Sequence, residues 1–251
     1  MPEVSIIIPT LNEGDYLARS LRCLTILDPP AKEVVVVDGG SADNTLSVLN
    51  QHSRDMVHPF DVTVVECDHP CRATQMNLGA KRAKGDVLCF LHGDTLVPDD
   101  LVALVETTLA DPGIACGGFI SLMAGDTTRW LTSLHNSFKT YYAALLFHPI
   151  LFFRNGFRVL FGDQVMFCRR QDFWACGGFD ASLTIMEEAD LCIKLSRRGR
   201  IVQVNRTVVS SDRRVAKWGT LKANFIYLMI GFLWGMGVSD TALRQFYEDV
   251  R

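Results

Sequence analysis

Short β-branched runs that alternate with amphipathic helical segments restrict the fold of this chain more than any other feature. Residues 34–37 are a continuous apolar run and residues 4–8 are apolar except at Ser5, as expected of parallel strands buried on both faces. Between them, Leu17, Leu21 and Leu24 recur at helical spacing. The alternation continues through expected strands at 62–65 and 87–91 and expected helices at 43–50, 73–84 and from Pro98 onward. This order predicts an α/β fold with a mostly parallel central sheet and helices on both faces.

The second half of the chain is less regular. It contains expected strands at 114–122, 165–168 and 201–204 and an expected helix at 187–198. Further helices are expected at 221–233 and 241–247. Because no repeat and no Pro-, Gly- or Ser-rich linker interrupts the sequence, we expect residues 1–251 to form one domain with a helical C-terminal extension.

Composition and charge exclude several classes of protein. With 48% hydrophobic residues the chain is not a disordered protein, and 25 Lys plus Arg against 28 Asp plus Glu leave no basic stripe for nucleic acid. The first strand is not followed by Gly-x-Gly-x-x-Gly, which disfavours a dinucleotide-dependent dehydrogenase. The eight cysteines are scattered without a Cys-x-x-Cys pair, so we expect reduced thiols and a cytoplasmic protein.

Contact with a membrane depends on one apolar segment. We expect no signal peptide at the N-terminus, because Met1-Pro2-Glu3 carries no basic region and a strand-like run starts at once. Residues 225–238 carry no charge over 14 positions, fewer than the roughly 20 that a spanning helix needs. We therefore expect a helix docked on the core, with peripheral membrane contact as the alternative.

Polar residues gather at the ends of three expected strands, namely 10–13, 38–41 and 92–94. In parallel sheets, ligands bind beyond the carboxyl ends of the strands. Asp38 suits either a hydrogen bond to a nucleotide base or ribose, or a local turn. Asp94 suits either a divalent cation on a diphosphate or a local cap. The residue types alone leave both pairs of alternatives open.

Two further charged groups lie in the second half. Glu187, Glu188 and Asp190 begin an expected helix, where carboxylates are favoured electrostatically with or without a chemical role. Arg213 and Arg214 suit a phosphate group, although a basic pair is also common on a solvated surface.

The ordered set of motifs resembles glycosyltransferase family 2, the inverting enzymes with a GT-A fold. The resemblance is nearest to a bacterial-type subgroup assigned to arsenosugar biosynthesis. It spans nearly the whole chain and rests on residues 5–13, 36–45, 75–80, 85–95, 162–164, 177–179, 186–191 and 211–214.

This resemblance implies a fold, a reaction and its substrates. The fold would be a Rossmann-like GT-A domain, with a nucleotide-sugar-binding half at 1–95, an acceptor-side half at 96–214 and C-terminal helices at 215–251. The reaction would move a sugar from a UDP- or GDP-linked donor to the hydroxyl of an unknown acceptor, by one metal-assisted displacement that inverts the anomeric carbon.

The resemblance also implies site residues. Those for the donor nucleotide would be Pro9, Thr10, Asn12, Glu13, Asp38, Arg72, Asn77, His92, Gly93 and Asp94. Asp94 would bind Mg²⁺ or Mn²⁺. Those for the diphosphate and the acceptor would be Asp163, Gln164, Arg213, Arg214 and Trp218.

The chain departs from the family pattern at two positions. His92 occupies the first position of the Asp-x-Asp metal motif, and imidazole suits Mn²⁺ better than Mg²⁺. Glu188 replaces the aspartate that serves as catalytic base, so we assign Glu188 as the base with Asp190 as the alternative. These departures keep a noncatalytic nucleotide-sugar-binding protein as the alternative function, with a nucleotidyltransferase as a third hypothesis.

Overall fold

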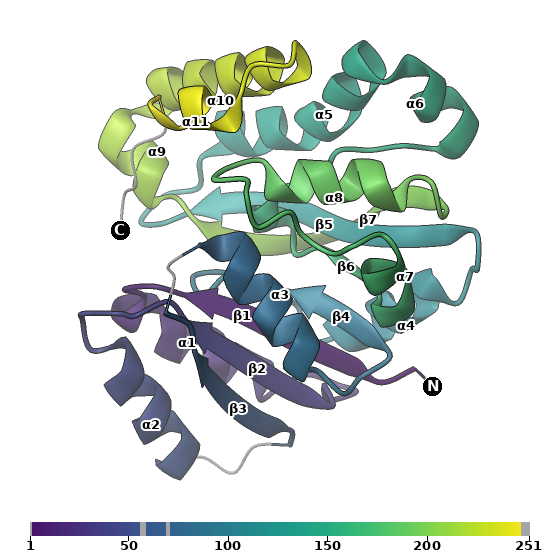
Figure 1. The fold of residues 1–251 in the computed structure, drawn as a ribbon. Coiled ribbons are helices and arrows are strands. Elements are labelled where there is room, and N and C mark those ends of the chain that lie inside the picture. Colours follow the sequence, from purple (N-terminus) through teal and green to yellow (C-terminus); the bar gives the residue numbers. More distant parts are fainter. Residues whose placement is uncertain (1, 56–58, 69–70, 247–251) are drawn as a thin grey trace.

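A seven-stranded sheet forms the centre of the protein (Figure 1). The computed structural model describes residues 2–55, 59–68 and 71–246. The strands lie in the order β3-β2-β1-β4-β6-β5-β7. Their bounds are β1 Val4–Thr10, β2 Glu33–Asp38, β3 Asp61–Glu66, β4 Val87–Phe90, β5 Ile114–Ala124, β6 Phe167–Arg169 and β7 Arg200–Ser211.

Most neighbouring strands run parallel, which confirms the predicted α/β sheet. β1 pairs in parallel with β2 and β4, β2 with β3, and β5 with β7. The short strand β6 is antiparallel to both β4 and β5, and it joins strands from the two halves of the chain into one sheet. Because Thr10 lies opposite Asp38 and Ile7 opposite Phe90, the loops that follow β1, β2 and β4 leave the sheet at the same edge.

Helices cover both faces of the sheet. Alternate residues of β1 point to opposite sides, so Ile6 and Ile8 join one buried cluster and Ile7 joins another. The first cluster includes residues of α1 Gly14–Leu24, α2 Thr45–Asp55 and α4 Leu101–Leu109. The second includes residues of α3 Arg72–Arg82, α5 Trp130–Phe147, α7 Arg170–Ala175 and α8 Glu187–Leu195. The remaining elements are α6 Pro149–Asn155, the short 3₁₀ helix η1 Gly162–Gln164, α9 Arg213–Trp218, α10 Thr220–Gly235 and α11 Asp240–Arg244.

The expected strands and helices are present, and the largest differences lie in the second half. The strand expected at 201–204 extends through Ser211, because β7 pairs along most of β5 with two register shifts. Helix α5 had no counterpart among the expected elements. Its inner face carries Thr132, Asn136 and Thr140, so it lacks the continuous apolar stripe by which a helix is recognised. The helix expected at 241–247 begins as α11, and residue 247 lies outside the described residues.

The helix expected at 225–238 is present, but the expectation that it is buried in the core is wrong. Helix α10 forms there, but its buried residues are Ala223 and Ile230, whereas Phe225 is 65% exposed. Apolar content does not fix burial, because α10 lies on α5 at the outside of the molecule (Figure 1). Within the described residues, no helix is both long and apolar enough to cross a membrane.

Candidate functional site

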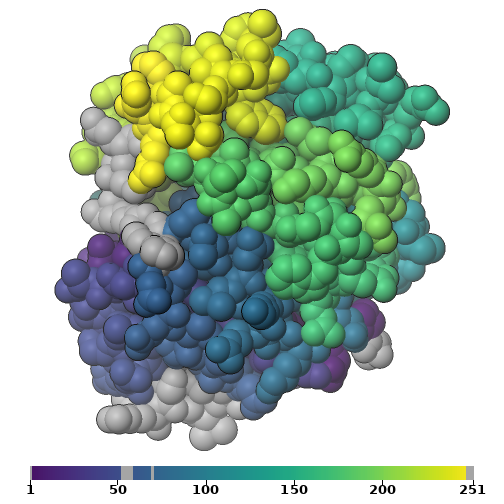
Figure 2. Space-filling model, in the orientation of Figure 1, coloured from purple at the N-terminus to yellow at the C-terminus, as the bar shows by residue number. Residues whose placement is uncertain are grey.

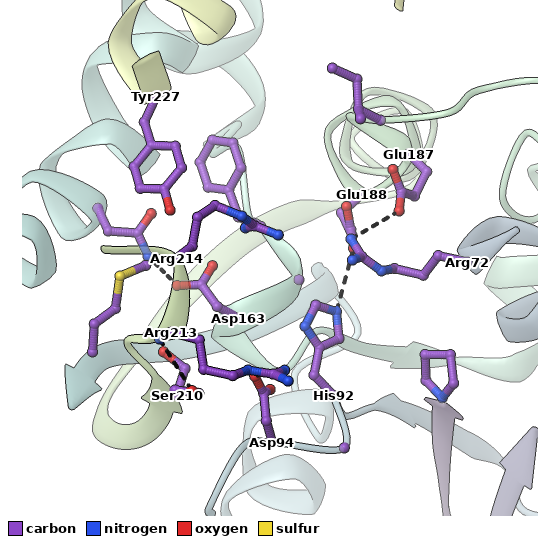
Figure 3. A pocket seen from close by; sticks show the side chains of 18 of the residues that line it. Arg72, His92, Asp94, Asp163, Glu187, Glu188, Ser210, Arg213, Arg214 and Tyr227 are labelled. Carbon is purple, nitrogen blue, oxygen red and sulfur yellow. Dashed lines mark hydrogen bonds and ion pairs between the residues drawn. The ribbon is translucent and has the colours of Figure 1, made fainter. Parts of the chain in front are cut away.

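A cavity opens at the edge of the sheet where β1 and β4 end (Figure 3). Helices α3, α5, α8, α9 and α10 and the η1 turn contribute to its wall. It collects eleven of the residues that the sequence predicted for the site: Pro9, Thr10, Glu13, Arg72, His92, Gly93, Asp94, Asp163, Glu188, Arg213 and Arg214. Residues as far apart in the sequence as Pro9 and Arg214 therefore share one cavity.

Two carboxylates and one guanidinium meet on one side of the cavity. Arg213 donates from Nη2 to a carboxylate oxygen of Glu13 at 3.0 Å and to Oδ2 of Asp94 at 2.8 Å. The guanidinium also lies over the ring of Tyr16, 4.4 Å from its centroid. Burial and the charge of Asp94 raise the pKa of Glu13, while Arg213 opposes that rise. This side of the cavity can therefore bind both a cation, through the carboxylates, and phosphate oxygens, through the guanidinium.

An imidazole and a carboxylate face each other on the other side. His92 Nε2 and Glu188 Oε1 are 3.8 Å apart, and both atoms are buried without a hydrogen-bond partner among the described residues. Figure 3 shows His92 pointing toward Glu188 and Arg72. A Cβ built on Gly162 would lie 2.4 Å from that nitrogen and 2.5 Å from that oxygen. Both atoms therefore pack against the backbone of Gly162, and because His92 and Glu188 also line the cavity, a hydroxyl group in the cavity can bond to both.

Two adjacent glutamates at the start of α8 differ in acidity. Burial and the charge of Glu188 raise the pKa of Glu187 to about 7. Burial alone would also raise the pKa of Glu188, but His92 and Arg72 hold it below its usual range. Arg72 lies 3.4 Å from Glu187 Oε1. At neutral pH Glu188 is therefore the ionised member of the pair, as a base must be.

We expect the raised pKa of Glu187 to make stability fall as pH rises from about 4.5 to about 7. In this window the folded protein retains a proton that the unfolded chain releases. Glu13 adds a contribution of the same sign, whereas the lowered pKa of Glu188 acts only below about 4.5. The Glu187→Gln variant should show a shallower slope and a Tm about 3 °C above the wild-type value at pH 8.

The measurement for this prediction is Tm against pH for the wild type, Glu187→Gln and Glu66→Gln. Glu66 is an exposed glutamate at the end of β3 and should leave the profile unchanged. A lower Tm for Glu187→Gln at pH 8 would show instead that the charged contact with Arg72 stabilises the fold.

Two residues predicted to contact the donor are hydrogen-bonded within and between the loops after β1 and β2, and they lie outside the cavity lining. Asp38 accepts hydrogen bonds from the backbone N–H groups of Gly40 and Ser41 at 2.9 and 2.8 Å. The backbone N–H of Asn12 donates to Ser41 Oγ at 2.9 Å, and Asn12 Oδ1 accepts from the backbone N–H of Ala42 at 2.8 Å. These contacts fasten the loops after β1 and β2 together and so shape the neighbouring cavity wall.

Four other predicted residues also lie outside the cavity lining. The side chain of Asn77 exchanges two hydrogen bonds with the backbone of Phe179, at 2.8 and 3.0 Å. Gln164 is buried and accepts from the backbone N–H of Phe161 at 3.0 Å, which fixes the η1 turn. Asp190 pairs with Lys194 at 2.7 Å. The fourth residue is Trp218, and the Arg214 guanidinium lies over its ring, 5.8 Å from the ring centroid.

Helix α5 adds lining residues that the sequence analysis did not identify. Asn136 donates to Asp163 Oδ2, and Lys139 lies 3.6 Å above the ring of Phe161. Burial lowers the pKa of Lys139 to about 8, although Asp163 and Glu188 oppose that shift. A signal was present in the sequence, because polar residues recur at helical spacing in this otherwise apolar segment.

A family model matches more than half of the chain. The model described as "Glycosyl transferase family 2" matches residues 5–174. The poly-beta-1,6-N-acetyl-D-glucosamine synthase of Staphylococcus epidermidis is 27% identical over 97 residues, which are 39% of this chain and 23% of that protein. The glycosyltransferase AglE of Haloferax volcanii is 32% identical over 116 residues, which are 45% of this chain and 38% of that protein. The chain thus matches less than two-fifths of the length of either relative.

Solved structures extend the similarity over almost the whole chain. The mannosyltransferase PcManGT of Pyrobaculum calidifontis, in complex with GDP-Man and Mn²⁺, superposes with a TM-score of 0.68 at 21% identity. That superposition covers 95% of this chain and 65% of the other. The glucosyl-3-phosphoglycerate synthase of Mycobacterium tuberculosis, in complex with Mn²⁺, UDP and phosphoglyceric acid, superposes with a TM-score of 0.63 at 18% identity. That superposition covers 95% of this chain and 80% of the synthase chain. At these identities the likeness shows the fold, which is the GT-A fold.

Proposed function

Because this chain belongs to glycosyl transferase family 2, we propose that it transfers a sugar from a nucleoside-diphosphate donor to an acceptor hydroxyl. The observation that carries the proposal is the pair of unpartnered buried atoms beside Gly162, His92 Nε2 and Glu188 Oε1. A hydroxyl between them can donate its proton to Glu188 while its oxygen stays oriented toward the cavity.

In the proposed step Glu188 is the base. It takes the hydroxyl proton as the acceptor oxygen forms a bond to the anomeric carbon. The bond from that carbon to the diphosphate breaks, and its electron pair leaves with the diphosphate. Because the acceptor attacks from the face opposite the nucleotide, the configuration at the anomeric carbon is inverted.

The leaving diphosphate gains negative charge, which the protein must offset. Arg213 and Arg214 line the cavity, and Arg213 is already oriented by Glu13, Asp94 and Tyr16. Guanidinium groups held in place in this way stabilise developing charge without reorganising during the reaction. We therefore assign the two arginines to the diphosphate.

A divalent cation is part of the proposal, since two of the similar structures hold Mn²⁺. Within the described residues, no three His, Cys, Asp or Glu side chains form a metal site by themselves. Asp94 and Glu13 nevertheless present adjacent carboxylates on the cavity wall, where Arg213 holds both of them. Because Mg²⁺ is commonly held by one or two carboxylates together with substrate phosphates, these residues fit. A bound cation would neutralise charge on the diphosphate.

We expect the Asp94→Asn variant to lose the metal dependence of donor binding. In the wild type, chelation of Mn²⁺ or Mg²⁺ should weaken binding of the nucleoside diphosphate by about 10- to 100-fold. In Asp94→Asn, titration calorimetry should give the same weak affinity with and without metal. Asp61→Asn, at an exposed position on β3, is the matched control and should behave as the wild type. Metal dependence that survives in Asp94→Asn would exclude Asp94 as the ligand.

The reaction itself is tested with UDP-, GDP- and dTDP-linked sugars and a panel of hydroxyl acceptors. Release of nucleoside diphosphate together with an inverted glycosidic product supports the proposal. Release of pyrophosphate would identify a nucleotidyltransferase, and donor binding without turnover on any acceptor would favour a noncatalytic binding protein. The motif resemblance to the arsenosugar subgroup adds arsenic-substituted alcohols to the acceptors in the panel.

A further inference from the structure

Helices α5 and α10 each expose a stripe of large apolar side chains to solvent. On α5 the stripe is Trp130, Leu134, Phe138, Tyr141 and Leu145, and on α10 it is Leu221, Phe225, Leu228 and Phe232. Spacings of three and four residues place each set on one side of its helix. Trp130 is 70% exposed and Leu221 is 79% exposed. Helix α6 extends the surface with exposed Ile150 and Phe153.

The two stripes belong to neighbouring helices in one outer layer. His135 on α5 lies 2.7 Å from Asn224 on α10, and the rings of Phe147 and Phe232 are 5.9 Å apart. Figures 1 and 2 show these helices together at the top of the molecule, away from strands β1–β3. We call the exposed side chains of α5, α6 and α10 the apolar face. Scattered apolar residues are normal on a protein surface, but an ordered set of this size indicates an interaction site.

The segments that form the apolar face carry charges of one sign, although Lys139, Arg213 and Arg214 line the cavity and Arg129 pairs with Asp212. Residues 129–162 and 213–239, which include α5, α6, α9 and α10, contain eight Lys and Arg and no Asp or Glu. The whole chain, by contrast, has 25 basic and 28 acidic residues. Arg154, Lys217 and Lys222 are exposed at the margin of the face. The partner that this arrangement fits is therefore apolar with a negatively charged margin.

A lipid bilayer with anionic headgroups has that chemistry. Helices with an apolar side and a basic margin lie in the plane of such an interface, with aromatic residues at headgroup level. A second copy of the chain fits less well, because a symmetric contact would bring the same basic residues together. We propose that the apolar face docks the protein on anionic membranes, with α5 and α10 in the plane of the surface.

The test is vesicle flotation with the full chain. Vesicles of equal parts phosphatidylglycerol and phosphatidylcholine should carry the protein, and pure phosphatidylcholine should bind it at least about tenfold more weakly. Salt at about 0.5 M should weaken the anionic binding, because it screens the basic margin. Equal binding to both kinds of vesicle would overturn the electrostatic part of the proposal.

Two double variants test the apolar and the electrostatic contributions to membrane binding separately. Trp130→Ser with Phe225→Ser should reduce binding to anionic vesicles by at least about tenfold, and Lys217→Glu with Lys222→Glu should remove the preference for anionic lipid. The matched controls are Ile26→Ser, at a position 65% exposed after α1, and Lys81→Glu with Arg82→Glu on α3.

Circular dichroism and nucleotide-induced thermal shift verify that each variant is folded. Controls that lose binding as strongly as the face variants would overturn the proposal. The proposal would also be overturned if the wild-type protein did not bind vesicles but formed a dimer, and if the Trp130→Ser, Phe225→Ser double variant dissociated that dimer. A second copy of the chain would then cover the apolar face.

Discussion

The Glu188→Gln variant is expected to lose sugar transfer by about 10²- to 10⁴-fold in kcat, with the donor Kd within about threefold of the wild-type value. Glutamine keeps the size of the side chain and its fit against Gly162, but it cannot accept the acceptor proton. A loss confined to kcat is the signature of a group that acts in the transition state and not in donor binding. Single-turnover release of nucleoside diphosphate and calorimetry with the donor measure the two quantities.

Asp190→Asn is the matched variant for this experiment, because it removes the alternative base. The Asp190 carboxylate pairs with Lys194 at 2.7 Å and lies outside the cavity lining. We therefore expect its kcat to stay within a few-fold of the wild-type value. If Asp190→Asn loses the activity and Glu188→Gln keeps it, the assignment of the base is reversed.

The Gly162→Ala variant is expected to fold and bind the donor but to lose transfer by about two orders of magnitude or more. The added methyl would lie 2.4 Å from His92 Nε2 and 2.5 Å from Glu188 Oε1, so it would displace the two side chains assigned to bind the acceptor hydroxyl. Both atoms are at the ends of side chains, so the fold can adjust while the base and the imidazole move apart. Misplacement by about 1 Å at a reacting centre is enough to cost about 10²-fold in rate.

A second glycine of the same cavity provides the control. Gly231 on α10 also lines the cavity, but a Cβ added there would meet no atom within 4 Å. Gly231→Ala should therefore retain activity within a few-fold. If Gly162→Ala is as active as Gly231→Ala, the acceptor hydroxyl does not bind between His92 and Glu188. Melting temperatures of the two variants separate a folding defect from a defect in catalysis.

Much of the fold followed from local sequence patterns. The largely apolar runs at 4–8, 34–37 and 87–91 predicted the inner strands, because a strand covered on both faces carries apolar residues at nearly every position. The polar residues at strand ends were likewise predicted to share one edge, and Thr10, His92 and Asp94 line the same cavity. Helix α5 was not anticipated, since its buried polar face obscures the apolar period.

The candidate site was only partly contained in the motifs. Residue type indicated which side chains could carry chemistry, but it did not show which atoms the fold leaves unpartnered. Asp38 ends the buried strand β2 and Asp94 comes shortly after the buried strand β4, yet Asp38 accepts hydrogen bonds from its own loop, whereas Asp94 faces the cavity beside Arg213. Lys139 carried no motif and reached the cavity only through the packing of α5.

The sequence by itself determined the α/β architecture and the family, because hydrophobic period and ordered short motifs are local properties of a chain. Only the tertiary structure decided that Glu188 and not Asp190 faces His92 across Gly162, and that α10 lies outside the core. The physical reason is the same in both cases. The direction of a side chain and the burial of a helix depend on contacts with segments that are distant in the sequence, and no local pattern records those contacts.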